Sequence, residues 1–273
     1  MKRISLMLVS ALALTMFSCK VQDPINVEDN PVNEETRYAL SFNGTTDHIV
    51  IKNVPRSIGV NSTTSAWIYR TETATNQQWI AGMGARQNLV VQKTGKVAIT
   101  NYLAKGRQDG NLDPGYWCSV SDPDTVPHNQ WVHYTGVIET DGVNTTFKLY
   151  KNGVLVNQQT FEYAVNGNPG CVGFIGGVHT ENNEGIECDF RTPQRFVGMI
   201  DEVAMWNRAL SPTEIQDVMQ RKLNCEDEGL VGYWPFEEGM GLISIDKSKY
   251  VNTASLKYGP QWVKLVIKKD SNI

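Results

Sequence analysis

The sequence predicts an all-β fold, a sandwich of two antiparallel sheets accompanied by one short helix. Short segments in which apolar and polar residues alternate recur along the chain, and tight-turn pairs such as Asn152-Gly153 separate them. Helical periodicity is confined to residues 212–222. The chain has 273 residues, which is enough for one large β domain, so no second domain is required.

The clearest strand is Phe196–Trp206. Apolar residues occupy both of its faces and only Asp201 and Glu202 interrupt them, a pattern typical of a strand that is covered on both sides. A carboxylate buried in such a strand is costly unless a partner neutralises it. Asp201 is therefore expected to bind a metal ion or, alternatively, to accept backbone hydrogen bonds or pair with Arg208.

The helix start is equally clear. Ser211 is a good N-cap residue, Pro212 occupies a position where a helix tolerates proline, and Glu214 completes a Ser-x-x-Glu capping box. Ile215 and Val218 then lie on one apolar face. The sequence predicts a short amphipathic helix that packs against the sandwich.

The remaining strands follow from alternating apolar residues between turn signals, and the hairpin across Lys151-Asn152-Gly153 is the clearest of them. Two long segments, 103–128 and 162–195, are expected to be irregular apart from one strand-like run, and loops of such length usually have a role. Strands are predicted at 38–42, 48–52, 64–70, 78–82, 88–92, 97–102, 131–139, 145–150, 154–161, 171–176, 230–236, 243–246 and 260–267.

The run G-M-I-D-E-V-A-M-W-N-R-A-L-S, at 198–211, resembles the closing signature of bacterial laminin-G-like domains of the concanavalin A-like jelly-roll superfamily. Three further segments resemble that family in the same order: residues 39–51, the pair 131–139 and 148–156, and residues 230–239. The resemblance implies a concanavalin A-like jelly-roll β-sandwich. It carries little functional information, because one fold hosts many functions.

The resemblance also implies a structural calcium ion between the first and closing strands, since related jelly-roll modules commonly hold one there. Asp201 would be one ligand and Asn43, in the Asn43-Gly44 turn, another. Calcium takes six to eight oxygen ligands, so turn carbonyls and water could complete the set. Asn43 replaces an Asp common in the family, and the missing charge is expected to weaken calcium binding.

The first 18 residues read as a lipoprotein signal peptide, because Lys2 and Arg3 precede an apolar run that ends at Ser18-Cys19. Cys19 is the predicted lipidation site. Residues 19–36 are polar and acidic, as expected of a flexible tether, and resemble the export signals of Bacteroides-type surface lipoproteins. The sequence therefore predicts a protein that is anchored by lipid in the outer membrane and displayed at the cell surface, with the folded domain at 37–267.

Charge and cysteine content narrow the partners further. The net charge of −4 becomes −6 once residues 1–18 are removed, which argues against nucleic acid as a partner. Four cysteines remain, and an even number in an exported protein predicts two disulfides with three possible pairings. Pairing of Cys118 with Cys171 or Cys188 is favoured, because it would join the two irregular segments. The four candidates are Cys118, Cys171, Cys188 and Cys225.

No complete catalytic set is evident. Glycoside hydrolases of this fold family often use a Glu-x-Asp-x-x-Glu strand, and Glu187-Cys188-Asp189 supplies its first two acids. Thr192 stands where the third acid would be. The sequence therefore favours a non-catalytic module, and an accessory glycoside hydrolase-like protein is the alternative.

Aromatic residues in or near loops are the remaining candidates for a binding site. Trp79, Tyr116 and Trp117 lie there, and exposed aromatic rings stack on sugar rings much as they anchor protein interfaces. The sequence thus predicts a lipid-anchored module that binds a carbohydrate or a cell-surface protein partner, with these three residues in the site.

Overall fold

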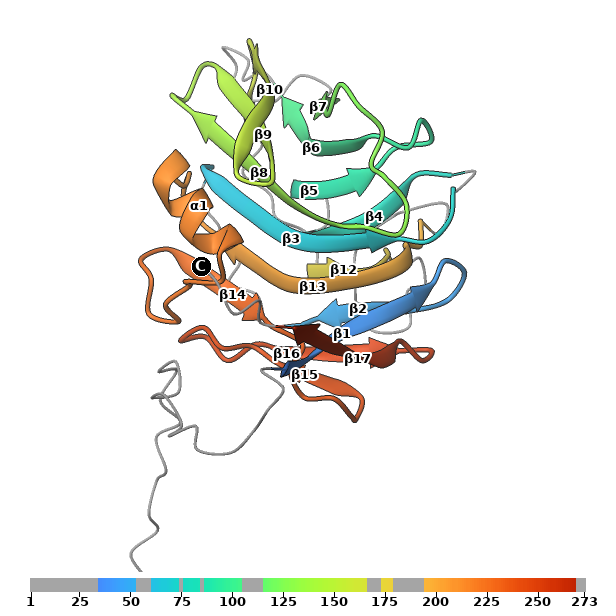
Figure 1. Cartoon of the computed structure of the whole chain (residues 1–273). Helices are drawn as coiled ribbons and strands as arrows, with labels where there is room; N and C mark the ends of the chain where they lie inside the picture. Colours follow the sequence, from blue (N-terminus) through green and yellow to red (C-terminus); the bar gives the residue numbers. More distant parts are fainter. Residues whose placement is uncertain are drawn as a thin grey trace, which may run out of the picture. The chain divides into compact units, whose positions relative to one another are not determined.

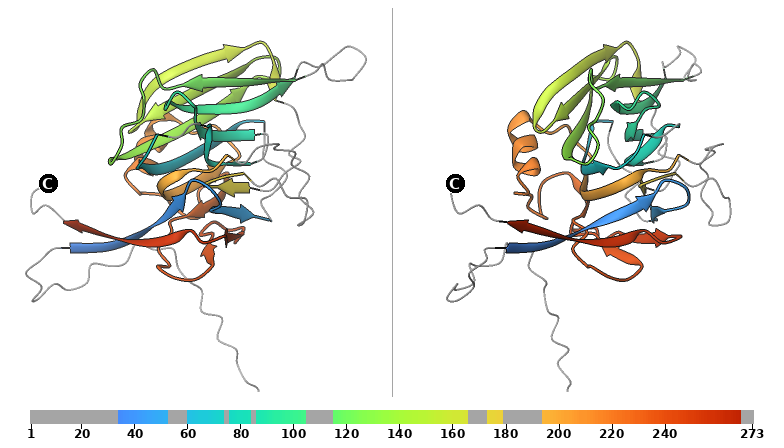
Figure 2. Two further views of the ribbon diagram at one scale, coloured as in Figure 1. Left: turned by 90° about the vertical axis from the view of Figure 1, so that its right-hand side faces the viewer. Right: turned by 45° about the vertical axis from the view of Figure 1, so that its right-hand side comes forward.

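Two antiparallel sheets, A and B, lie face to face in the computed structural model (Figures 1 and 2). The structure describes residues 34–52, 60–73, 76–83, 86–104, 115–165, 173–178 and 194–268, all within the unit Pro31–Ile273. This architecture confirms the predicted all-β sandwich. None of the helices in these described ranges is long and apolar enough to cross a membrane.

Sheet A has eight strands in the described residues, in the order β10-β9-β8-β3-β13-β1-β17, and β14 also pairs with β13. The strands are β1 (Glu34–Asn43), β3 (Ser62–Arg70), β8 (Trp131–Thr140), β9 (Thr145–Lys151), β10 (Val154–Phe161), β13 (Val197–Trp206), β14 (Leu230–Trp234) and β17 (Gln261–Lys268).

Sheet B has nine strands over the same described ranges, in the order β11-β6-β5-β4-β12-β2-β16-β15, and β7 also pairs with β6. The strands are β2 (His48–Ile51), β4 (Gln78–Met83), β5 (Arg86–Val91), β6 (Val97–Ala104), β7 (Tyr116–Ser121), β11 (Ala164–Val165), β12 (Gly173–Ile175), β15 (Ile243–Ile245) and β16 (Thr253–Lys257).

The main core fills the space between the two sheets. Alternate side chains of each strand point into it, because successive residues of a strand face opposite sides. Sheet A contributes Leu40, Ile68 and Ile200, and sheet B contributes Ile80 and Ile99, all of them fully buried. Residues of opposite parity therefore lie on the outer faces of the two sheets.

The predicted strand at 196–206 is confirmed as β13, which pairs with β1, β3 and β14. A β-bulge interrupts its pairing with β3 between Asp201 and Ala204, and Glu202 adopts a φ of 53° there. The bulge places both acidic side chains away from the main core, which a regular alternation would not allow.

The predicted helix is confirmed as α1 (Pro212–Met219), which lies against the outer face of sheet A (Figures 1 and 2). The backbone N–H of Glu214 donates to the hydroxyl of Ser211, and the Glu214 carboxylate accepts from the Ser211 N–H at 2.7 Å. Ile215 packs with Trp206 in a second apolar cluster. The helix is shorter than predicted, because it ends at Met219 and Arg221 has a φ of 60°.

Three sequence predictions need correction. Residues 34–36, assigned above to the tether, form the start of β1 and pair with residues 266–268 of β17. The segment 103–128 was expected to be irregular but contains β7, which extends sheet B. Strand β16 was not predicted, although it pairs with β2 and β15. Each of these segments is extended because it pairs with another strand. Local composition does not reveal that partner.

Candidate functional site

The outer face of sheet B carries the candidate site. Trp79 on β4, Val90 on β5, Thr100 on β6 and Trp117 on β7 point outward. Neighbouring residues on the same four strands point into the main core: Ile80, Leu89, Ile99 and Cys118. Because these four strands are consecutive in the sheet, their outward side chains form one continuous surface.

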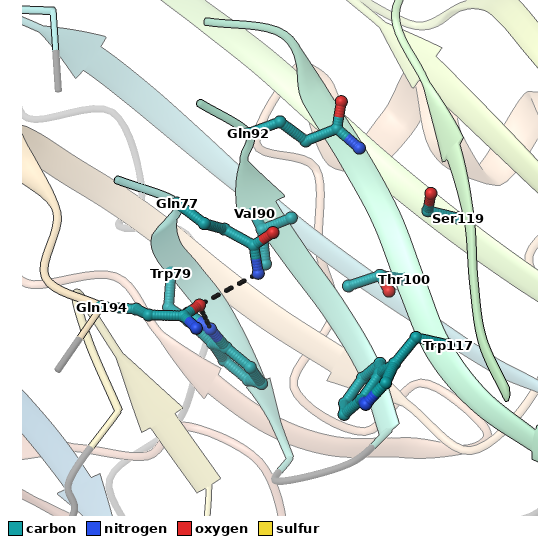
Figure 3. Close-up of a pocket in the computed structure, with 8 residues that line it drawn as sticks. All are labelled: Gln77, Trp79, Val90, Gln92, Thr100, Trp117, Ser119 and Gln194. Atoms are coloured by element: carbon teal, nitrogen blue, oxygen red, sulfur yellow. Dashed lines mark hydrogen bonds between the residues drawn. The ribbon is translucent and has the colours of Figure 1, made fainter. Parts of the chain in front are cut away.

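This surface contains a cavity of about 350 Å³, which we call the Trp117 pocket (Figure 3). The volume falls within the range of known small-molecule sites, roughly 300–1,000 Å³. Its lining combines two indole rings, one aliphatic side chain, and amide and hydroxyl groups. The described residues that line it are Gln77, Trp79, Val90, Gln92, Thr100, Trp117, Ser119 and Gln194.

Gln194 holds one wall of the Trp117 pocket in place. Its Oε1 atom accepts a hydrogen bond from the indole Nε1 of Trp79 at 2.5 Å and another from Nε2 of Gln77 at 3.0 Å (Figure 3). Trp79 is 2% exposed and packs with Val90 in a small cluster on this face. Trp79 is therefore a fixed wall of the pocket and offers little ring surface to a ligand.

Trp117 provides the accessible aromatic surface. Its side chain is 53% exposed, and its ring meets Tyr102 edge-on, with 5.7 Å between the ring centroids. Tyr102 lies opposite Trp117 on the neighbouring strand, so the pairing of β6 with β7 fixes this contact. An indole held from one side can stack on the apolar face of a flat ligand with little loss of conformational freedom.

The structure brings two of the three predicted binding residues together. Trp79 and Trp117 line the same pocket, but Tyr116 does not. Because it precedes Trp117 on β7, Tyr116 points to the opposite face, where it packs on Tyr163 with 5.7 Å between ring centroids. Tyr116 therefore does not line this pocket, although its side chain is 56% exposed.

Sequence reasoning missed the polar lining of the pocket. Gln92, Thr100 and Ser119 have the outward parity that a period-two reading of their strands assigns. Gln194 gave no such signal, because it lies far along the chain from Trp79 and reaches it only through the fold.

Asp201 and Asn43 do not form the predicted calcium site. Asn43 pairs with Val197, four residues before Asp201 on β13, which separates the two by roughly 13 Å along the strand. The Asn43 Oδ1 atom accepts three backbone hydrogen bonds within its own turn. The two side chains therefore lie too far apart to hold one ion between them, and calcium binding by the protein stays a prediction.

Asp201 is compensated by a cation instead. Its carboxylate accepts a hydrogen bond from the guanidinium of Arg221 at 2.9 Å and another from the backbone N–H of Glu202 at 2.9 Å. Burial raises the pKa of Asp201 to about 8, and the nearby Glu202 carboxylate also raises it, while Arg221 lowers it. The alternative partner Arg208 pairs with Glu214 at 2.6 Å.

The cysteine prediction also changes. Cys118 is a free, buried thiol on the inner face of β7, and burial raises its pKa. Its predicted pairing with Cys171 or Cys188 is therefore wrong, because its side chain points into the apolar core. Cys225 is disulfide-bonded. Cys171 and Cys188 lie outside the described residues, as do Cys19 and the acidic pair Glu187 and Asp189.

Two facing antiparallel sheets with a single helix against one outer face in the described residues define an all-β jelly-roll sandwich. The chain belongs to the concanavalin A-like lectin/glucanases superfamily, whose family model matches residues 43–216, more than half of the sequence. No curated protein matches the chain.

Solved structures share this fold. A candidate carbohydrate-binding protein from Bacteroides ovatus superposes with a TM-score of 0.62 at 16% identity, covering 86% of this chain and 62% of that one. This chain thus spans less than two thirds of that protein. A pentraxin from Limulus polyphemus has a TM-score of 0.45 at 15% identity, covering 85% of this chain and 95% of its own. The carbohydrate-binding module of a Ruminococcus gnavus sialidase, solved with sialyllactose, has a TM-score of 0.45 at 12% identity, covering 68% and 98%.

Proposed function

We propose that this protein is a non-catalytic carbohydrate-binding module whose ligand lies in the Trp117 pocket. The half-exposed indole of Trp117 carries the proposal, because it faces a cavity lined by amide and hydroxyl groups. Sugar rings present one apolar face and many hydroxyls, so an aromatic platform beside amides and hydroxyls matches both features. The superfamily and the described binding of its Bacteroides ovatus neighbour are consistent with this function.

The absence of a carboxylate supports the non-catalytic part of the proposal. Most glycoside hydrolases use two acidic side chains that flank the bond they cleave. None of the eight described residues that line the Trp117 pocket is acidic. An assay for release of reducing sugar from a bound glycan tests the non-catalytic role. Release that is lost in a Glu187→Gln variant would contradict that role and favour the glycoside hydrolase-like alternative.

Trp117→Ala is expected to weaken glycan binding at least about tenfold, because the stacking surface is lost. Tyr116→Ala is the matched control: the two residues are adjacent and similarly exposed but face opposite sides. Glycan-array screening followed by calorimetry on both variants measures the effect. Equal affinity in wild type and Trp117→Ala, or a loss confined to Tyr116→Ala, would contradict the assignment.

A module that retains one stable protein partner and binds no glycan would favour protein recognition instead.

The proposal includes a lipid anchor at Cys19 and display at the outer surface of a bacterial outer membrane. It rests on the sequence of residues 1–36, with its charged start, its apolar run and its acidic tether. Cys19→Ala should move the protein from the membrane fraction to the soluble fraction, because acyl chains supply about 0.8 kcal/mol of membrane affinity per buried methylene. A variant that still sediments with membranes after a salt wash would exclude Cys19 as the anchor.

A further inference from the structure

A second cavity adjoins the Trp117 pocket. It measures about 250 Å³, and we call it the Asn76 pocket. Gln77 lines both cavities, and the consecutive residues Gln194 and Arg195 line one each. The Asn76 pocket alone is smaller than most ligand sites, whereas the two together reach well into the usual range. The side chain of Gln77, hydrogen-bonded to Gln194, stands at their junction.

The Asn76 pocket differs in chemistry from its neighbour. No aromatic residue is among the described residues that line it, and its polar groups include Glu72, Thr73 and Asn76, all exposed. A ligand there would be held by hydrogen bonds, whereas a ligand in the Trp117 pocket would also stack on an indole. Two such environments side by side suit a ligand with two linked polar rings.

Gln78 gives independent evidence that the Asn76 pocket binds a hydrogen-bond donor. Its side chain lines this cavity and is 2% exposed, yet its Oε1 atom has no hydrogen-bond partner among the described residues. A buried acceptor without a donor is costly, and native structures rarely retain one. A hydroxyl group of a bound sugar would supply the missing donor.

We propose that the ligand is an oligosaccharide spanning both cavities, with an uncharged sugar residue stacked on Trp117 and the next residue hydrogen-bonded in the Asn76 pocket. The first residue is uncharged because the described lining of the Trp117 pocket holds no Lys, Arg or His to compensate a buried carboxylate. This inference rests on the proposed function and specifies its ligand.

The test uses neutral cello-, malto-, manno- and xylo-oligosaccharides of one to six units as probes in calorimetry. In the best-binding series, affinity should rise at least about tenfold from monosaccharide to oligosaccharide. Asn76→Ala should lower the affinity for the oligosaccharide roughly five- to tenfold and leave that for the monosaccharide unchanged. Trp117→Ala should weaken both ligands.

Gln78→Leu distinguishes a sugar hydroxyl from a water molecule at the orphaned oxygen. If a sugar hydroxyl donates to Oε1 of Gln78, this variant loses affinity for the oligosaccharide but not for the monosaccharide. Its melting temperature is measured to confirm that it folds. One outcome would overturn the oligosaccharide inference and leave the proposed function standing. In it, binding depends on Trp117 but its affinity does not rise with chain length and is unchanged in Asn76→Ala and Gln78→Leu. Binding of none of the four series, or of sialylated glycans in preference to neutral ones, would also overturn it.

Discussion

Single residues show how strongly strand parity decides function in this fold. Tyr116 and Trp117 are neighbours with nearly equal exposure, and both were predicted as ligand contacts from their aromatic character. Only Trp117 faces the pocket, because β7 pairs with β6 in a register that places Trp117 opposite Tyr102. Composition identified the aromatic residues, but choosing between them required recognition of β7, which its Gly- and Asp-rich surroundings obscured.

Asp201 is a second residue whose environment the sequence predicts only in part. The sequence correctly indicated that this carboxylate needs a partner, but it could not identify Arg221. That partner follows the end of α1 and is directed to the bulge of β13 by a backbone φ of 60°. The arginine also lies over the ring of Trp67, with 5.9 Å between its Cζ atom and the ring centroid.

Arg221→Gln should destabilise the protein in a pH-dependent way. The folded-state pKa of Asp201 lies above its unfolded value, so stability falls as pH rises through about 8 and the buried carboxylate ionises. Without Arg221 this ionisation is less compensated, and the loss should reach about 3 kcal/mol at pH 9 but be smaller at pH 5.5. Chemical denaturation at the two pH values measures it. As a control, the effect of Arg221→Gln in an Asp201→Asn background should not depend on pH. If the Arg221→Gln variant loses the same unfolding free energy at both pH values, the ion pair is not responsible.

At the scale of elements, the start of helix α1 and both ends of strand β13 were predicted to within one residue, because each carries its own local signal. The capping box marks the start of α1, and the apolar run marks β13. Strands β7 and β16 were missed because sheet partners distant in sequence stabilise them. Local patterns thus predict elements with strong caps or turns and fail for strands whose stability comes from pairing.

The cap of α1 should weaken in acid. Hydrogen bonding with Arg208 lowers the pKa of Glu214 to about 2, and its bond to Ser211 also lowers it. Because the folded-state pKa is depressed, the stabilisation is present above the unfolded pKa of about 4.5 and is lost as pH falls toward 2. Between pH 5 and pH 2.5, the melting temperature of the Glu214→Gln variant should therefore fall less than that of the wild type. If the two melting temperatures fall by the same amount over this range, the carboxylate does not stabilise the helix.

At the scale of the folded unit, the two outer faces of the sandwich differ. Helix α1 packs on the outer face of sheet A, whereas the outer face of sheet B carries the Trp117 pocket. The adjoining Asn76 pocket is lined by residues from both sheets and from the loops between their strands. The family resemblance predicted the sandwich correctly but not which face would hold a site, since that depends on where Gln194 and β7 lie. Gln194 could not be predicted as part of the site, because it reaches Gln77 and Trp79 only through the fold.

We expect a glycan to bind at the outer face of sheet B, over Trp117. The most direct measurement is a titration of ¹⁵N-labelled protein with the best-binding oligosaccharide, monitored through its tryptophan indole N–H resonances. Binding in the Trp117 pocket should shift the resonances of Trp117 and of Trp79, whose indole donates a hydrogen bond to Gln194. The resonances of Trp67 and Trp206 on sheet A should stay unchanged. Shifts at Trp67 or Trp206 with no change at Trp117 and Trp79 would contradict this expectation.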